Sequence, residues 1–356
     1  MRYFGVVYDT GLPYIPGRNT IDPFDPQLVE YDMKVISEEM RANAVRIEGE
    51  DLERLTAATR IAHANGLAVW FNPWKMEANV EETTTYMAEA AKIAEQLRQE
   101  GVDLVFVTSC EISIFTHGVY PGETYFERGA WLGSQFASMP LEAMSAHVMP
   151  DTLKEKSVVL NEALRKFVAA VRAEFSGPVT YSAGTWEGVD WTPFDFIGLD
   201  AYRRGEPADQ YVATLKRFKE EGKPIGALEF GSCAYEGAAA KGDAGFAVLL
   251  GRNPDGSGNF VDDVVPVRKE KEQADYVAEQ LELLDQAGFD HAFVYQFNHP
   301  AYPAGEGAKD LDMVAFGLVK FPPAEDPRSE AMPPWERKEA FYSAADFFSK
   351  QSARVH

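Results

Sequence analysis

Short apolar runs alternate with longer amphipathic stretches throughout this 356-residue sequence. Eight runs have the length and composition of buried β-strands: residues 3–9, 43–49, 67–74, 103–111, 179–186, 194–202, 223–230 and 291–298. Helical periodicity is found at residues 26–42, 51–66, 80–99, 152–174, 208–221 and 269–287, and a closing helix is expected at 335–348. Strands that alternate with helices form parallel sheets, so this α/β pattern predicts a (β/α)8 TIM barrel rather than an open doubly wound sheet.

Two of the expected connections are much longer than the others. Residues 115–151 follow the fourth strand, and residues 231–266 follow the seventh. Both lie at the carboxyl ends of strands, on the face where barrel enzymes hold their active sites, and connections of this length are usually functional. The sequence has no internal repeat and no low-complexity linker, so we expect a single catalytic barrel domain over residues 1–356.

The chain carries a formal net charge of −22, from 34 basic and 56 acidic residues. A field of this sign repels nucleic acids and anionic membranes, so neither is expected as a partner. No window of 18 apolar residues is present, so no segment is expected to span a membrane. A neutral carbohydrate is compatible with this charge, and the acidity is equally consistent with a role in solubility alone.

Cysteine is scarce in this sequence, which contains only Cys110 and Cys233. Two cysteines cannot form a disulfide framework, and neither belongs to a CxxC or zinc-binding pattern. The N-terminal residues MRYFGVVYD enter a strand directly, without the charged leader and apolar stretch of a secretion signal. These features predict a cytoplasmic protein.

Two of the expected strands end in a glutamate. The segment KPIGALEFG, residues 223–231, places Glu229 where the apolar run stops, and DLVFVTSCEIS, residues 103–113, does the same for Glu111. A carboxylate at the end of a buried strand costs free energy unless it is paired or used. Because the carboxyl ends of barrel strands converge around one pocket, we expect the two glutamates to meet there.

Other side chains are expected to reach the same pocket from the remaining strand ends. They are mainly carboxylates, amides and aromatic rings, with few histidines. Amides and carboxylates hydrogen-bond to hydroxyl groups, and aromatic faces stack on the apolar faces of sugar rings, so a carbohydrate is the expected substrate. The predicted substrate-binding residues are Arg46, Asn72, Trp74, Trp186, Asp200, Tyr202, Gln296 and Asn298.

Hydrolysis of a glycosidic bond requires two carboxyl groups, one protonated and one ionised. Glu111 is the predicted acid/base, with its pKa raised by an apolar pocket and by the negative charge opposite it. Glu229 is the predicted nucleophile, kept ionised by Arg46 and Tyr202. These residues predict a glycosidase that uses no cofactor and no metal ion; the sugar, its anomeric configuration and the oligomeric state stay open.

Glutamates that end strands four and seven resemble the clan A retaining glycoside hydrolases, whose acid/base and nucleophile occupy these two places. Arg46 resembles the arginine that supports the nucleophile in that clan, and Tyr202 resembles the tyrosine that orients it. The sequence departs from the clan where Cys110 replaces the asparagine before the acid/base, and where strand eight lacks a tryptophan. The clan's asparagine holds the sugar 2-hydroxyl, a contact for which Asn72 or Asn298 is the expected replacement.

Other interpretations of the same residues stay open. Asp200 also ends a strand, and it could pair with either glutamate in catalysis. A metal-dependent sugar isomerase or epimerase could use Glu48, Glu111, Asp200 and Glu229 with a histidine as ligands, although the six histidines are poorly placed for this. A non-catalytic carbohydrate-binding barrel fits the same composition.

Overall fold

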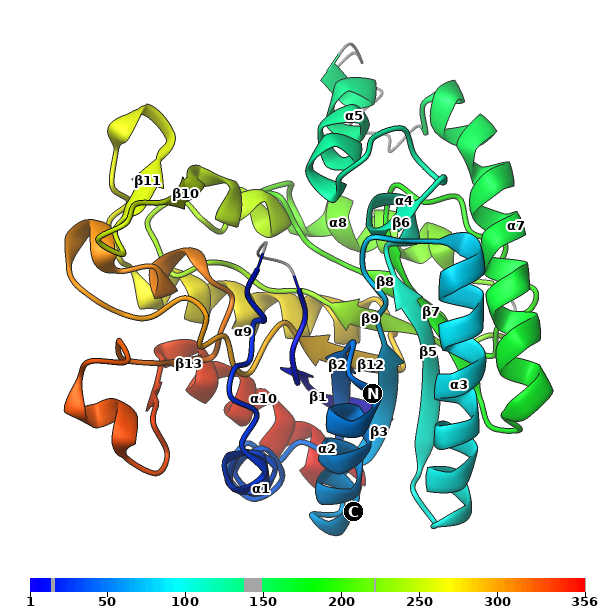
Figure 1. The fold of residues 1–356 in the computed structure, drawn as a ribbon, viewed down its shortest axis with the longest axis horizontal. Coiled ribbons are helices and arrows are strands. Elements are labelled where there is room, and N and C mark those ends of the chain that lie inside the picture. The colour runs from blue at the N-terminus through cyan, green and yellow to red at the C-terminus, as the bar shows by residue number, and fades with distance from the viewer. Residues whose placement is uncertain (14–16, 138–148, 221, 356) are drawn as a thin grey trace.

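The computed structural model describes residues 1–13, 17–137, 149–220 and 222–355. Eight parallel strands close into a barrel in the spatial order β1-β2-β3-β5-β7-β8-β9-β12, and β12 pairs with β1 (Figure 1). Their bounds are β1 Tyr3–Asp9, β2 Ala44–Gly49, β3 Ala68–Pro73, β5 Leu104–Cys110, β7 Val179–Gly184, β8 Ile197–Asp200, β9 Ile225–Glu229 and β12 His291–Val294. The predicted TIM barrel is therefore confirmed.

Most of these strands are followed by a helix on the outside of the barrel. The helices are α1 Pro26–Lys34 with the π-helical turn η1 Val35–Glu39, α2 Leu52–Ala64, α3 Val80–Gln99, α7 Asp151–Glu174, α8 Ala208–Leu215 with the 3-10 turn η2 Lys216–Phe218, α9 Glu270–Gln286 and α10 Glu339–Val355. A capping box begins α3, because Asn79 and Glu82 each accept a hydrogen bond from the other's backbone N–H. No helix in the described ranges has the length and apolar character needed to cross a membrane.

The alternation of strands and helices is interrupted between β7 and β8. Residues 185–196, all within the described chain, form turns and no helix there. Lys223 fixes this connection by donating to the carbonyl groups of Trp191 at 2.8 Å and Phe194 at 2.5 Å. The closing helix begins at Glu339 rather than at residue 335, because the preceding segment forms a small antiparallel pair, β13 Val319–Lys320 with β14 Glu336–Arg337. Three 3-10 turns precede it: η5 Gly307–Lys309, η6 Asp312–Val314 and η7 Pro327–Glu330.

The two long connections contain secondary structure that the sequence did not indicate. The connection after β5 forms α4 Ile112–Phe115, β6 Thr116–His117, which pairs with β4 Ala78–Asn79, and α5 Tyr125–Ala137. Residues 125–137 form a helix that the sequence analysis did not predict, and residues 138–148 of this connection lie outside the described chain. The connection after β9 holds η3 Gly242–Val248, the hairpin β10 Leu249–Arg252 with β11 Gly258–Phe260, and η4 Val261–Asp263. Figure 1 shows α5 and this hairpin at the same end of the barrel.

Aromatic side chains fill the barrel interior near the beginning of the strands. The ring centroid of Trp70 lies 4.3 Å from that of His291, 5.2 Å from that of Phe293 and 5.4 Å from that of Phe196. All four side chains are buried. The interior of the described barrel is thus a packed layer rather than a pore, and barrel enzymes hold their ligands at the carboxyl ends of the strands.

Candidate active site

The end of β5 departs from regular strand geometry where it carries Cys110 and Glu111. Its register with β7 shifts between Val107 and Cys110, and Ser109 and Glu111 have left-handed φ angles of 70° and 40°. The backbone N–H of Glu111 still donates to the carbonyl of Ser182 at 2.9 Å, so pairing continues beyond the bulge. Left-handed non-glycine residues cost about 1–3 kcal/mol each and concentrate at functional sites, where bulges redirect side chains.

A second register shift lies between β8 and β9, the strands that carry Asp200 and Glu229. Leu199 is paired with Ala227, whereas Asp200 is paired with Glu229, so Leu228 has no opposite residue. This shift brings the two carboxylate-bearing residues into direct register on adjacent strands. A sequence reader cannot locate such a bulge, because the apolar pattern of the two strands contains no break.

Glu229 receives hydrogen bonds on both of its carboxylate oxygens. Oε1 lies 2.8 Å from Nη1 of Arg46 and 3.3 Å from Sγ of Cys110. Oε2 accepts from the hydroxyl of Tyr202 at 3.1 Å. Such donors, and the guanidinium in particular, stabilise an ionised carboxylate. The environment of Glu229 therefore suits a nucleophile that carries its charge in the resting protein.

Arg46 is itself completely buried and bound on several sides. Its Nε and Nη2 donate to Oδ1 of Asn72 at 3.0 and 2.6 Å, and its Nη1 donates to the carbonyl of Leu228 at 3.0 Å. A second carboxylate, that of Glu48, lies 3.4 Å from Nη2. The side-chain oxygen of Asn72 thus orients Arg46 against Glu229, and the contact of Asn72 with substrate stays a prediction.

Glu111 and Asp200 lie in surroundings that favour their neutral forms. Burial raises the pKa of Glu111 well above its usual range, and the negative charges of Asp200 and Glu229 raise it further. Burial and the charge of Glu229 likewise raise the pKa of Asp200, whose Oδ1 accepts from the hydroxyl of Ser182 at 2.5 Å. Glu111 is nevertheless only half-buried, so a ligand can reach its side chain.

Glu187, which the sequence analysis did not single out, lies beside the residues that follow Glu111. Its carboxylate accepts from the hydroxyl of Tyr181 at 2.8 Å and from the backbone N–H groups of Ser113 and Gly184, both at 3.1 Å. Burial raises the pKa of Glu187 to about 7. Because these bonds hold the start of α4, Glu187 is a positioning residue for Glu111. Its sequence signal is a carboxylate in a short connection directly after a strand.

The two tryptophans predicted to bind a sugar differ in their surroundings. Trp74 is buried, and its ring meets that of Phe115 edge-on at 4.9 Å. The aromatic series continues outward, from Phe115 to Tyr125 at 5.7 Å and from Tyr125 to Phe126 at 4.1 Å, and the side chain of Phe126 is exposed. Trp186 is half-buried, and its indole N–H donates to a serine hydroxyl at 3.2 Å. The sequence analysis missed the outer aromatic rings because it predicted no helix in residues 125–137.

Gln296 and Asn298, the predicted contacts at the end of strand eight, are both buried. Asn298 accepts from the backbone N–H of Asp9 at 3.1 Å and donates to the carbonyl of Asp9 at 3.0 Å. The amide of Asn298 thus joins the ends of β1 and β12, and its contact with substrate stays a prediction. The side-chain nitrogen of Gln296 lies 2.5 Å from Nδ1 of His299. The amide oxygen of Asn72 accepts two hydrogen bonds from Arg46, whereas that of Asn298 accepts one from the backbone.

Cys110, Asp200 and Glu229 form a possible metal-binding group, since their ligand atoms all lie within 4.8 Å of one another. The guanidinium of Arg46 contacts the same oxygen of Glu229 that faces Cys110, so a cation there would meet a positive charge. Burial also raises the pKa of the Cys110 thiol, which keeps the sulfur protonated and a poor ligand. These residues fit a hydrogen-bonded carboxylate pair better than a metal centre.

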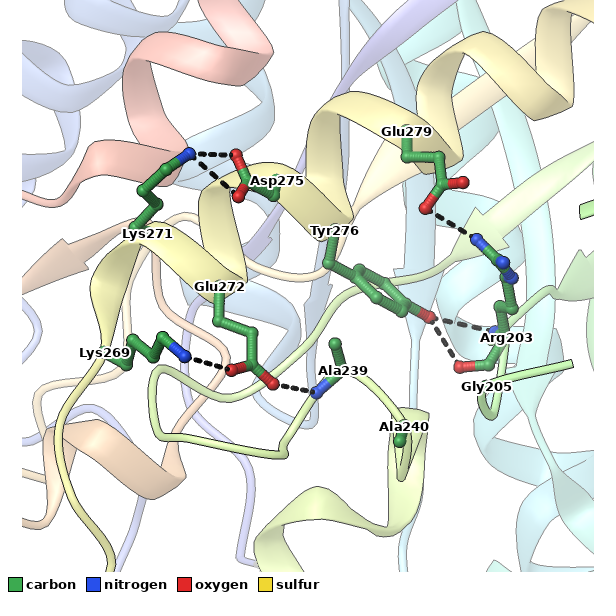
Figure 2. Close-up of a pocket in the computed structure, with 10 residues that line it drawn as sticks. All are labelled: Arg203, Gly205, Ala239, Ala240, Lys269, Lys271, Glu272, Asp275, Tyr276 and Glu279. Atoms are coloured by element: carbon green, nitrogen blue, oxygen red, sulfur yellow. Dashed lines mark hydrogen bonds and ion pairs between the residues drawn. The ribbon is translucent and has the colours of Figure 1, made fainter. Parts of the chain in front are cut away.

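A separate pocket of about 510 Å³ lies between α9 and the connections that follow β8 and β9. Figure 2 shows that its charged side chains pair with one another, as Arg203 does with Glu279 at 2.7 Å. The hydroxyl of Tyr276 donates to the carbonyl of Arg203 at 3.0 Å and accepts from its N–H at 2.9 Å. Arg203 directly follows Tyr202, so these bonds from Tyr276 hold the backbone next to the predicted site tyrosine.

Solved structures of several glycosidases share this fold over the whole chain. A GH113 β-1,4-mannanase is 16% identical, with a TM-score of 0.55 and coverage of 98% of this chain and 99% of the mannanase. A GH113 β-mannanase from Alicyclobacillus acidocaldarius in complex with ManMIm is 17% identical, with a TM-score of 0.53 and 98% of both chains covered. A family 1 β-glucosidase from Thermotoga maritima is 12% identical, with a TM-score of 0.54 and coverage of 98% and 97%.

Comparisons with family models and with curated protein sequences gave no match. Identities of 12–17% to the three solved structures show a shared fold and leave the activity to be argued from the site. The closed barrel of eight parallel strands is common to all of them. The chain therefore has the same (β/α)8 fold as these glycosidases.

Proposed function

We propose that this protein is a glycoside hydrolase that cleaves its substrate by a retaining mechanism with two carboxyl groups. Glu111 is the acid/base and Glu229 is the nucleophile. The observation that carries the proposal is the unequal environment of the two glutamates. Glu229 is paired with Arg46 at 2.8 Å, whereas burial and nearby negative charges raise the pKa of Glu111. One carboxyl group is thus kept ionised and the other protonated, as glycoside hydrolysis requires.

The reaction follows from these protonation states. Glu111 donates its proton to the glycosidic oxygen as the bond from that oxygen to C1 breaks, and Glu229 attacks C1 to form a glycosyl-enzyme. A water molecule then attacks C1 and gives a proton to Glu111, and the bond between C1 and Glu229 breaks. Arg46 and Tyr202 orient the carboxylate for the first step and stabilise it when it leaves in the second.

The comparisons support the class of reaction, because the similar structures include mannanases and a β-glucosidase. They leave the sugar open, since these proteins act on different sugars by their names. The half-buried rings of Phe115 and Tyr125 and the exposed ring of Phe126 support a carbohydrate as the ligand, because aromatic faces bind the apolar faces of sugars.

Aryl glycosides of both anomeric configurations provide the test. We expect release of the aryl group from at least one sugar, and proton NMR should show that the first product has the configuration of the substrate. Glu111→Gln and Glu229→Gln should each reduce kcat by about 10³-fold or more, as losses of a catalytic group do. Azide should restore turnover to Glu229→Gly and give a glycosyl azide of inverted configuration.

Glu236→Gln is the matched control, because Glu236 lies seven residues after Glu229 and its side chain is 66% exposed. This variant should keep the activity of the parent protein. Full activity in either catalytic variant would refute the assignment of that glutamate. A first product of opposite configuration would replace retention with inversion.

The grouping of Cys110, Asp200 and Glu229 favours a second candidate, a metal-dependent sugar isomerase. That candidate predicts conversion of an aldose to a ketose, its loss after dialysis against EDTA and its return with Mg²⁺ or Mn²⁺. The glycosidase predicts aryl release that EDTA leaves unchanged. A non-catalytic binding barrel predicts sugar affinity without turnover in the parent protein, and the same affinity in Glu111→Gln.

A further inference from the structure

Arg252 is a half-buried cation at the end of β10, in the connection that follows the nucleophile strand. Its Nη2 donates to the carbonyl of Ala301 at 2.5 Å, and its guanidinium carbon lies 4.5 Å from the centroid of the Tyr302 ring. No carboxylate of the described ranges forms an ion pair with it, although the chain carries a net charge of −22. A half-buried guanidinium without a counter-charge is costly, so its charge calls for an explanation.

A second arginine makes this local charge stronger. Arg18, in the connection after β1, is exposed and likewise has no ion pair with a carboxylate among the residues that the structure describes. Burial lowers the pKa of Arg252, and the positive charge of Arg18 lowers it further. An anion bound at Arg252 would offset its charge and reduce this repulsion.

The position of Arg252 relates it to the candidate active site. Tyr302, on which it stacks, meets the ring of His299 at 4.7 Å, and His299 contacts Gln296 at the end of the eighth barrel strand. Burial and the nearby phenol of Tyr302 raise the pKa of Tyr125 on α5, one of the rings in the aromatic series from Trp74. Figure 1 shows the β10–β11 hairpin and α5 at the same end of the barrel. Arg252 is thus part of the rim above the strand ends.

We propose that Arg252 binds an anionic group on the substrate, so that the protein acts on acidic glycosides. This inference rests on the proposed function and names its substrate class. The group is a compact oxyanion, either a carboxylate on the sugar or a sulfate or phosphate ester. A guanidinium is suited to it because its planar fork donates two parallel hydrogen bonds, and stacking on Tyr302 fixes the plane of that fork.

A structural role for Arg252 makes a different prediction. Support of the Ala301 carbonyl needs a hydrogen-bond donor but no positive charge, and Gln retains such a donor. Arg252→Gln would then leave the preference between acidic and neutral substrates unchanged. Recognition of an anion requires the charge, so Arg252→Lys should retain part of the preference and Arg252→Gln should lose it.

Matched pairs of aryl glycosides test the proposal on the full-length protein. Each pair shares one sugar and one anomeric configuration and differs at one position: glucoside against glucuronide, galactoside against galacturonide, and glucoside against its 6-sulfate and 6-phosphate. We expect kcat/KM about 10- to 100-fold higher for the acidic member of at least one pair, the range of a hydrogen bond to a charged group. The uronide and ester pairs distinguish the carboxylate from the esters.

Arg252→Gln should reduce this ratio about tenfold or more, mainly through KM, and 0.5 M NaCl should weaken it in the parent protein. Arg165→Gln is the control, since Arg165 lies on α7 with a side chain 54% exposed. The ratio of kcat/KM between acidic and neutral substrates in Arg165→Gln should equal that of the parent protein. Equal rates for acidic and neutral members, or an unchanged ratio in Arg252→Gln, would overturn the proposal.

A binding measurement separates this inference from the glycosidase proposal. Titration calorimetry of Glu111→Gln with glucuronate, galacturonate, glucose 6-sulfate and glucose 6-phosphate should show binding of at least one acid. The same acid should bind at least tenfold more weakly to Glu111→Gln/Arg252→Gln. Such binding without hydrolysis of any glycoside would refute the proposed reaction and retain the anion subsite. Hydrolysis without any preference for acidic sugars would refute the anion subsite and retain the proposed reaction.

Discussion

Arg46→Met is the substitution from which the structure predicts the sharpest consequence. The guanidinium is completely buried, lies 2.8 Å from Glu229 and 3.4 Å from Glu48, and is oriented by Asn72. Methionine fills a similar volume without a charge. The variant therefore retains most of the packing but leaves two buried carboxyl groups without their cation.

The magnitude follows from the ion-pair geometry. Two unit charges separated by 2.8 Å attract by about 6 kcal/mol at an effective dielectric constant of about 20. The desolvation of both groups in the parent protein offsets part of this, and loss of one partner of a buried pair typically costs about 3–5 kcal/mol. We expect Arg46→Met to lower the free energy of unfolding by about 4 kcal/mol at pH 8.

The loss should depend on pH, and the sign can be worked out from Glu48. Burial raises the pKa of Glu48, and Arg46 counteracts that rise, so the pKa is higher still in Arg46→Met. A folded state with the higher pKa binds more protons than the unfolded chain, so its stability falls as pH rises from the unfolded pKa through the folded one. The deficit of Arg46→Met should therefore be small near pH 4.5 and grow as pH rises toward 8.

Urea denaturation followed by circular dichroism at pH 4.5, 6 and 8 measures this deficit. The double variant Arg46→Met/Glu229→Gln completes a mutant cycle, in which the coupling between the two sites should reach about 2–3 kcal/mol at pH 8. Arg165→Gln, on the exposed face of α7, should change stability by less than about 0.5 kcal/mol. A deficit below about 1 kcal/mol that is equal at all three pH values would refute the account of Arg46 as the balancing charge.

Three further outcomes are expected. Asp32, whose pKa burial raises to about 7, should make the parent protein less stable as pH rises from about 4 to 7, and Asp32→Asn should remove about 2–4 kcal/mol of that dependence in urea denaturation. Cys110 and Cys233 are buried thiols with raised pKa values, so a disulfide reagent at pH 8 should modify neither in the native protein and both in urea. Tyr276→Phe, which removes the hydroxyl that holds the Arg203 backbone, should lower kcat/KM for an aryl glycoside about three- to tenfold and stability by about 1–2 kcal/mol.

The barrel could be predicted from sequence because its signals are local and repeated. Each strand is a short apolar run, and each helix has its own periodicity and end signals, as in the capping box of Asn79 and Glu82 at the start of α3. Parallel strands joined by helices then leave few ways to bury every strand on both faces. The one missing helix, between β7 and β8, was not marked by any amphipathic stretch in residues 185–196.

The details of the site depend on contacts between residues far apart in the sequence. Strand ends alone indicated Arg46 and Glu229, but the two bulges that bring Asp200 beside Glu229 and redirect Glu111 leave no trace in the apolar pattern. Asn72 was expected at the substrate because amides bind sugars, yet its partner is Arg46, 26 residues away. Buried acceptors compete for the same donors, so which of them pairs with Arg46 depends on the three-dimensional arrangement and cannot be predicted from the sequence.

Charge balance gives a further reason for the assignment of the two catalytic roles. Three buried carboxyl groups, those of Glu48, Asp200 and Glu229, lie with the half-buried carboxyl group of Glu111 around one cation, Arg46. Burial raises the pKa of Glu48, Glu111 and Asp200. A single guanidinium compensates one negative charge well, so protons must neutralise most of the others near pH 7. The carboxylate with the shortest contact to Arg46 is that of Glu229, which supports Glu229 as the proposed nucleophile. Glu111, the half-buried member with no cation in contact, is then the group that can hand a proton to a substrate.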